Sequence, residues 1–338
     1  MRKLLALLIA AAAATLVAGA ADPAAASKAT LGPYGWPIKP FDVAHPVRGG
    51  FGDPRTVFHG PPTARTLLTS SGSFQFHFGI DISAPDGTAV YPVADGTVTA
   101  VHGDWLQVDS GVGRAFQYWH VTSAVAIGDR VTTDVTVLGH IVRGAGHVHL
   151  SERDDRQYVN PLAPGHLEPY GDATAPHVAS IELKQSVGGP DLVPTLVRGR
   201  IELIADAYDT PSLPVPGDWH GLPVTPAVVE WRLQDARTGH VVVPERVVYD
   251  VRSVLPPRSE FWTVYARGTY QNMSVFGRHY SYMQPGSYLF RLTPGGLDTR
   301  TLADGVYEVV VTAIDIRGNR TSASRRFDVH NRPGIVGV

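Results

Sequence analysis

Two histidines one residue apart, His147 and His149, stand in the stretch GHVHLSE. Side chains two residues apart on a β-strand point to the same face, so this stretch, as a strand, directs both imidazoles to one place. A pair of this kind is also typical of buried histidines that are satisfied by backbone groups. The pair therefore indicates a metal site only if further ligands accompany it.

A second set of candidate ligands lies upstream in HFGID, where His77 and Asp81 flank Gly79. In an extended segment these three positions share one side. The same spacing also suits a surface histidine beside a turn aspartate, since the chain has 14 histidines. Two imidazoles and one carboxylate are the ligands of a catalytic zinc ion that leaves its fourth position to water. The residues alone predict a Zn2+ site formed by His77, Asp81 and either His147 or His149, with the other histidine beside the ion.

The absence of cysteine narrows the chemistry. With 0 Cys, the chain has no thiolate for metal binding or nucleophilic attack and no disulfide. Any metal site must therefore use histidines and carboxylates. One further histidine, His120, ends the aromatic-rich stretch AFQYWH, and by itself it is more typical of a core residue with a satisfied ring.

The order of the motifs changes that interpretation. FGDPR is followed by HFGIDISAPDGTAVYPVADGTVTAV, YWHV, IGDRVTTDVTVLGHI and GHVHLSERDDRQYVNPL. Over about residues 45–162 the chain resembles the lysostaphin/LytM-type zinc metalloendopeptidases, which cut peptide bonds in bacterial peptidoglycan. The resemblance implies that His77, Asp81 and His149 are the zinc ligands and that His120 and His147 flank the attacking water. It implies metal-assisted amide hydrolysis, with a stem or cross-bridge peptide of peptidoglycan as the substrate.

The chain departs from the family pattern in places. The family commonly reads TGPHLHFE where this chain has GAGHVHLSE, and HL where it has HV at His120. We expect Glu152, three residues beyond His149, to orient a ligand histidine, or else to be an ordinary surface carboxylate. The segment 55–75 is expected to be a long loop over the site, with SSGS at its centre.

The elements that must position these residues are predicted to be strands. The chain has 35 Gly and 27 Pro, which divide it into short β-branched runs separated by turn dipeptides such as PDGT and ADGT. This pattern predicts an all-β protein. An antiparallel β-sheet metallopeptidase domain is expected over 36–165, a linker over 166–177, a β-sandwich over 178–332 and a tail over 333–338.

The predicted sandwich shows no metal-like cluster, because His220, His240 and His279 are scattered. The stretch from Leu302 to Val329 resembles the last strands of bacterial Ig-like or fibronectin-like modules. The aromatic-dense stretch 260–282 would suit either a saccharide-binding or wall-binding surface, or sandwich core with an inserted hairpin.

Residues 1–20 begin with a basic pair, continue as a Leu/Ala-rich run and end in AGA, as in a secretory signal peptide. The alternative is a retained membrane anchor, because the run approaches the length of a bilayer span. Residues 21–35 are expected to be a flexible mature N-terminus, and no second hydrophobic span follows. The predicted location is secreted or periplasmic. A formal charge of −2 makes nucleic acid an unsuitable partner, and no pattern indicates an oligomeric state.

Three functions fit these observations. The leading hypothesis is a secreted zinc endopeptidase that acts on peptidoglycan peptides. The alternative is a catalytically silent relative that binds wall peptide and activates or recruits another hydrolase. A third is a structural or adhesion protein in which the sandwich is the working part.

Overall fold

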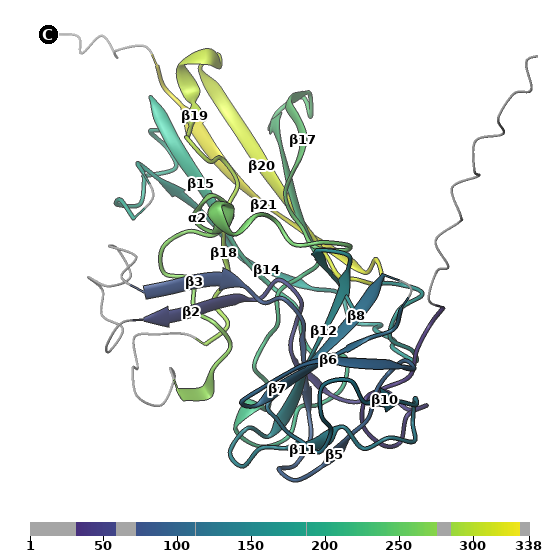
Figure 1. The fold of residues 1–338 in the computed structure, drawn as a ribbon. Helices are drawn as coiled ribbons and strands as arrows, with labels where there is room; N and C mark the ends of the chain where they lie inside the picture. Colours follow the sequence, from purple (N-terminus) through teal and green to yellow (C-terminus); the bar gives the residue numbers. More distant parts are fainter. Residues whose placement is uncertain (1–31, 59–71, 112, 187, 276–284, 332–338) are drawn as a thin grey trace, which may run out of the picture. The chain divides into compact units, whose positions relative to one another are not determined.

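Short antiparallel strands, separated by turns, run through the whole of the described chain (Figure 1). The computed structural model describes residues 32–58, 72–111, 113–186, 188–275 and 285–331. The structure therefore confirms the predicted all-β class, with several antiparallel sheets in the first region, up to residue 165, and further sheets in the second region, from residue 177. The predicted signal peptide and tail lie outside the described residues.

The first region is built on an eight-stranded antiparallel sheet. Along its path β12 lies between β4 and β8, so the strand that carries the histidine pair is an interior one. The strands, in spatial order, are β1 (Val47–Gly49), β4 (Ile80–Ser83), β12 (His147–Asp154), β8 (Arg114–Trp119), β7 (Trp105–Asp109), β6 (Gly96–His102) and β10 (Arg130–Val131), and β13 (Gln157–Val159) pairs with β12.

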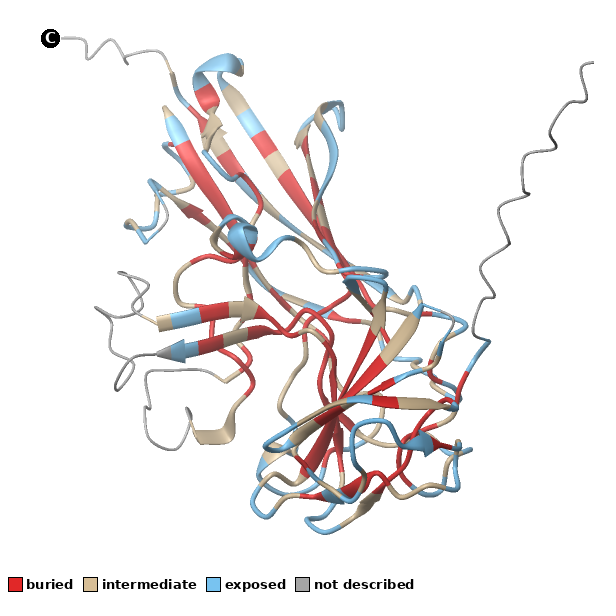
Figure 2. Ribbon diagram, in the orientation of Figure 1, coloured by how far each residue is buried: buried red, intermediate tan, exposed pale blue. Residues whose placement is uncertain are grey.

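Both faces of β12 are buried from His147 to Glu152, the part of the strand coloured red in Figure 2. On one face, Val148 and Leu150 are fully buried in an apolar core with Ile80 and Ile82 of β4. On the other face lie His147 and His149. Burial of each such aliphatic side chain contributes roughly 1.5–3 kcal/mol, so the apolar face fixes the register that aims the histidines.

Two smaller sheets complete the first region. One joins β5 (Ala89–Val90), β11 (Gly139–Ile141) and β9 (Val121–Ser123), and the other is a hairpin of β2 (Pro54–Phe58) and β3 (Gly72–Phe76). The prediction of a loop over 55–75 is therefore wrong at both ends, where alternating residues pair antiparallel from Pro54↔Phe76 to Phe58↔Gly72. Residues 59–71, with the SSGS centre, lie outside the described residues.

The second region contains two four-stranded antiparallel sheets. Apolar side chains from both sheets belong to one buried cluster, so the sheets pack together as the predicted sandwich requires. One sheet holds β14 (His177–Lys184), β15 (Arg200–Tyr208), β18 (Leu289–Arg291) and β19 (Leu297–Asp298), and the other holds β17 (Val241–Asp250), β16 (Val228–Asp235), β20 (Gly305–Ile314) and β21 (Arg320–Val329).

Helical structure in the described residues is short, and besides the helices named next it includes residues 274–275. The named helices are the α-helix α2 (Phe261–Val264) and the 3-10 helices η1 (Gly217–Trp219), η2 (Arg258–Glu260) and η3 (Thr299–Thr301). Among the described residues, none of these helices has the length and apolar character needed to cross a membrane.

The hairpin of the first region packs against aromatic side chains of the second. The rings of Phe74 and Trp262 lie 4.8 Å apart between centroids, and those of Phe76 and Phe261 lie 5.3 Å apart. Within residues 260–275 of the aromatic-dense stretch, Phe261, Tyr265 and Tyr270 are buried, which agrees with the core part of the second alternative. The inserted hairpin of that alternative is not seen in residues 260–275, and residues 276–284 lie outside the described residues.

The segment around the predicted domain boundary also packs against the first region. The backbone N–H of Tyr34 donates to His166 O, and Trp36 Nε1 donates to Pro169 O. Tyr34, in the expected flexible N-terminus, is itself buried. Residues 31–338 form one compact unit, and the division into two domains at 166–177 stays a prediction.

Candidate metal centre

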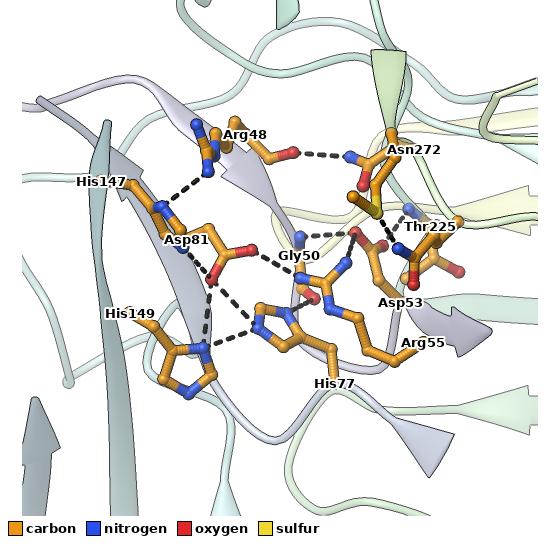
Figure 3. A network of polar contacts seen from close by, with 12 residues as sticks. Arg48, Gly50, Asp53, Arg55, His77, Asp81, His147, His149, Thr225 and Asn272 are labelled. Carbon is orange, nitrogen blue, oxygen red and sulfur yellow. Dashed lines mark hydrogen bonds and ion pairs between the residues drawn. The ribbon is translucent and has the colours of Figure 1, made fainter. Parts of the chain in front are cut away.

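Three of the predicted ligands converge on one point (Figure 3). His77 Nε2 lies 2.8 Å from His149 Nδ1 and 3.2 Å from Asp81 Oδ1, and His149 Nδ1 lies 3.1 Å from Asp81 Oδ1. All three side chains are buried. Of the two alternatives that the residues alone left open, the geometry brings His149 into this cluster.

Strand register produces the convergence. His149 on β12 is directly opposite Asp81 on β4, and His77 follows β3 in the short crossing to β4. Gly79 must be glycine for this approach, because a Cβ there would lie 2.7 Å from His149 Nε2 and 2.3 Å from Leu150 O. Between His77 and Asp81, the missing side chain of Gly79 allows the backbone before β4 to lie close to β12.

The other ring nitrogen of each histidine has its own partner. His77 Nδ1 donates to Gly50 O at 2.8 Å, and His149 Nε2 lies 2.7 Å from Ser151 Oγ. A histidine that donates from one nitrogen presents a lone pair at the other. His77 therefore directs a lone pair from Nε2 into the cluster, and His149 directs one from Nδ1 when its Nε2 donates to Ser151 Oγ. In that state two nitrogen lone pairs and a carboxylate oxygen face one another, an arrangement that a cation between them would stabilise.

Burial lowers the pKa of His77, and it lowers the pKa of His149 to about 3. For Asp81, burial raises the pKa, but His77 and Arg55 outweigh it and hold the pKa well below its usual value. Near neutral pH the cluster consists of two neutral imidazoles and one carboxylate. These are the protonation states in which metal ligands bind.

The cluster fits zinc. Ligand atoms about 2.0–2.1 Å from a tetrahedral zinc ion lie about 3.3 Å from one another, so the separations of 2.8–3.2 Å require shifts of only a few tenths of an ångström. Arg55 Nη2 donates to Asp81 Oδ2 at 2.6 Å, which leaves Oδ1 for the ion. Three protein ligands leave a fourth position open, as in a catalytic site.

The two remaining predicted site residues lie beside the cluster. His147 Nε2 is 3.4 Å from Asp81 Oδ1, and the rings of His147 and His120 are 4.5 Å apart between centroids. His120 directly follows β8 and has a positive φ of 64°. All five predicted positions are therefore within one site.

Two residues that the sequence analysis did not single out hold this histidine pair. Asp104 Oδ2 lies 3.2 Å from His120 Nδ1, and Arg48 Nη2 lies 2.6 Å from His147 Nδ1. Burial, followed by the neighbouring His147, lowers the pKa of His120. Neither Asp104 nor Arg48 stands at a distinctive spacing from the histidines, so local sequence carries no signal for them.

The expected role of Glu152 is wrong. Glu152 is fully buried on the opposite face of β12, where its carboxylate accepts hydrogen bonds from Tyr34 Oη at 2.5 Å and from Arg114. It is neither a support for a ligand histidine nor a surface carboxylate. Ser151, two residues after His149 and on the same face, is the partner of the ligand ring.

A pocket of about 320 Å³ opens over the cluster. Phe78 and Trp119 line it from the first region, and Trp219, Gln271 and Met273 line it from the second. The site is therefore open to a ligand, and its wall includes side chains far outside the stretch that carries the metal ligands.

A second group of ionisable side chains lies in the second region and the segment before it. Carboxylate oxygens of Asp172, Asp209 and Asp315 lie within 4.8 Å of one another. Sequence analysis, guided by histidines, found no cluster here. Asp315 already accepts hydrogen bonds from the backbone N–H groups of Arg317 and Asn319 in its own turn, and we assign no metal to this group.

Comparison with known proteins relates the site to a family. Residues 75–161 match the sequence model of Peptidase family M23. The matched stretch contains His77, Asp81, His120, His147 and His149. This stretch is therefore similar to Peptidase family M23, and the second region lies outside the match.

Several solved structures are similar to part of this chain, with low sequence identities and low TM-scores. A SpoIIQ–SpoIIIAH pore-forming complex is 20% identical over 39% of this chain and 90% of that chain, with a TM-score of 0.30. A zinc-containing peptidase from Vibrio cholerae is 20% identical over 38% and 39%, with a TM-score of 0.29. The catalytic domain of lysostaphin from Staphylococcus simulans is 19% identical over 33% and 86%, with a TM-score of 0.26. No curated protein matches the chain.

Proposed function

We propose that this protein is a secreted zinc metalloendopeptidase that hydrolyses peptide bonds in bacterial peptidoglycan. The observation that carries the proposal is the convergence of His77, Asp81 and His149 around one point, with the imidazoles of His120 and His147 beside it in an open pocket. The M23 family match supports the metallopeptidase class and the peptidoglycan peptide as substrate.

The residues divide into a metal-holding set and a proton-handling set. Zinc, held by His77, Asp81 and His149, would supply Lewis acidity that polarises a peptide carbonyl and makes a water molecule more acidic. His120 faces Asp104 through Nδ1, so its Nε2 is free to take a proton. His147 Nε2 points to the metal cluster, where it can donate a hydrogen bond to a carbonyl oxygen that gains charge.

The rival proposal is a silent relative that binds wall peptide and recruits another hydrolase. Loss of a ligand would favour it, but each of the five site positions carries the residue type that hydrolysis requires. Export through the predicted signal peptide completes the proposal, because peptidoglycan lies outside the cytoplasmic membrane.

The decisive experiment incubates purified protein with cell-wall sacculi and measures newly released amino groups. We expect cleavage with zinc, loss of cleavage with a chelator and recovery when zinc is restored. His77→Ala should be inactive, whereas His140→Ala, which removes an exposed histidine from β11, should match the wild type. Cleavage that survives both the chelator and His77→Ala would refute the zinc mechanism, and wall binding without cleavage would favour the silent relative.

Metal analysis of two neighbouring variants separates the two sets of residues. His149→Ala should lose both bound zinc and turnover. His147→Ala should keep zinc and lose turnover by about 10²–10⁴-fold, because it removes a proton-handling group but no ligand. Equal zinc loss in both variants would contradict this division.

A further inference from the structure

A tryptophan of the second region stacks on the arginine that contacts His147. The guanidinium carbon of Arg48 lies 4.0 Å from the ring centroid of Trp219, which ends η1. Both residues lie outside the stretch that matches the peptidase family, and both line the pocket over the metal cluster.

Arg48 determines which nitrogen of His147 carries the proton. Arg48 Nη2 lies 2.6 Å from His147 Nδ1 and 3.0 Å from Ala145 O, and His147 Nδ1 itself lies 2.8 Å from Ala145 O. The carbonyl of Ala145 alone would accept a proton from Nδ1, but a guanidinium only donates, so with Arg48 in this place Nδ1 accepts and Nη2 donates to both Nδ1 and Ala145 O. Neutral His147 therefore carries its proton on Nε2, the nitrogen that faces the metal cluster at 3.4 Å from Asp81 Oδ1.

His120 is held in the opposite way. Its Nδ1 faces the carboxylate of Asp104 at 3.2 Å, and a carboxylate only accepts, so Nδ1 carries the proton and Nε2 presents a lone pair. The two imidazoles thus offer one donor and one acceptor on the same side of the site. Hydrolysis of an amide needs both, one for the developing oxyanion and one for the proton of the attacking water.

The placement of Arg48 depends on the second region. The Arg48 side chain is buried, burial lowers its pKa to about 10, and its Nε has no hydrogen-bond partner among the described residues. Asn272 Nδ2 donates to Arg48 O at 2.5 Å, and the Trp219 ring covers the guanidinium. A cation that is shielded from water gains more from stacking on an aromatic ring than an exposed cation does.

We propose that the second region forms part of the active site, with Trp219 as a positioning residue that stacks on Arg48 and so keeps His147 as an Nε2–H donor toward the peptide carbonyl. This inference rests on the proposed function for the reaction that it serves. The position of the proton on the His147 ring can be measured without any turnover, so it is tested separately from the activity.

The test compares Trp219→Ala with Trp219→Phe, which keeps a flat aromatic face. Trp262→Ala is the matched control, because Trp262 stacks on Arg267 at 3.9 Å in the same region without lining the pocket. Turnover is measured with a soluble cross-linked muropeptide and zinc, bound zinc by metal analysis, and the ring nitrogens of His147 by ¹⁵N NMR of histidine-labelled protein.

We expect Trp219→Ala to lower kcat about tenfold with KM within about twofold, because a positioned donor is lost while the pocket remains. Bound zinc should be unchanged, and the His147 ¹⁵N signals should change from the pure Nε2–H form to a mixture. Trp219→Phe should restore most of kcat and of the NMR pattern, and Trp262→Ala should alter neither.

Unchanged His147 signals in Trp219→Ala, or an equal loss of kcat in Trp262→Ala, would overturn the proposal. If the wild type cleaves nothing with zinc, the proposed function fails, and the NMR comparison alone decides whether Trp219 orients His147. If Trp219→Ala does not fold, Arg48→Lys replaces it. This variant keeps the charge without the planar fork, and unaltered His147 signals and kcat would refute the inference.

Discussion

Asp81 and Asp209 are both buried aspartates in clusters of three ionisable side chains, yet their surroundings push their pKa values in opposite directions. The pKa of Asp81 lies well below its usual value, whereas burial, followed by the neighbouring carboxylates of Asp172 and Asp315, raises the pKa of Asp209 to about 8. One acid is ionised at neutral pH and the other retains its proton.

The difference lies in the neighbours. Asp81 has two imidazoles and the guanidinium of Arg55 around it, so its charged form has partners. Asp209 has two other carboxylates nearby, and it accepts a hydrogen bond from the backbone N–H of Thr210 at 2.8 Å. A group of neighbouring carboxylates is therefore not enough to indicate a metal centre. A carboxylate together with histidine nitrogens that other groups already orient is a stronger indication of one.

The largest expected effect comes from Asp81→Asn. The amide has nearly the same shape but carries no charge, so zinc affinity should fall by more than about 100-fold and cleavage should become undetectable. Isothermal titration with zinc and the sacculus assay measure the two effects. Asp42→Asn, at an exposed position, is the control. Wild-type zinc affinity in Asp81→Asn would show that this cluster is not the metal site.

Asp209→Asn should stabilise the protein instead. A folded pKa of about 8, against about 3.9 in the unfolded chain, means that the folded state binds the extra proton between these values. Stability from this group is thus fully present below about pH 4 and is lost as the pH rises to about 8. The variant should gain roughly 2–4 kcal/mol at pH 7 and show a flatter pH dependence.

Urea unfolding of Asp209→Asn at pH 5, 6, 7 and 8 measures this effect. Asp42→Asn should change stability by less than about 0.5 kcal/mol at each pH. A destabilised Asp209→Asn protein at pH 7 would mean that Asp209 is ionised in the fold, and the contrast with Asp81 would disappear.

The smallest effect concerns the orientation of His149. Ser151→Ala removes the partner of His149 Nε2, so zinc affinity should fall about 10–100-fold while the fold is retained. Ser83→Ala is a matched control on the adjacent strand, because its Oγ is buried without a hydrogen-bond partner among the described residues. Equal zinc affinity in the two variants would show that Ser151 does not orient His149 for zinc binding.

Much of the candidate centre could be predicted because its ligands lie in short motifs. In an extended chain, side chains two or four residues apart point to the same face, so the HxxxD motif around Gly79 and the HxH motif on β12 each present their ligands on one face. The structure brings these two faces together. The role of Glu152 was mispredicted for the same reason, since a shift of one residue moves a side chain to the other face. The partner that faces His149 is Ser151.

The sequence by itself determined the kinds of ligand, the all-β class and the strand faces, because these follow from residue type and local periodicity. Only the tertiary structure decided that Arg48 contacts His147, that Asp104 contacts His120 and that Trp219 covers Arg48. It also decided that three distant aspartates meet. Such contacts depend on strand order and packing between segments far apart in the chain, and no local spacing records them.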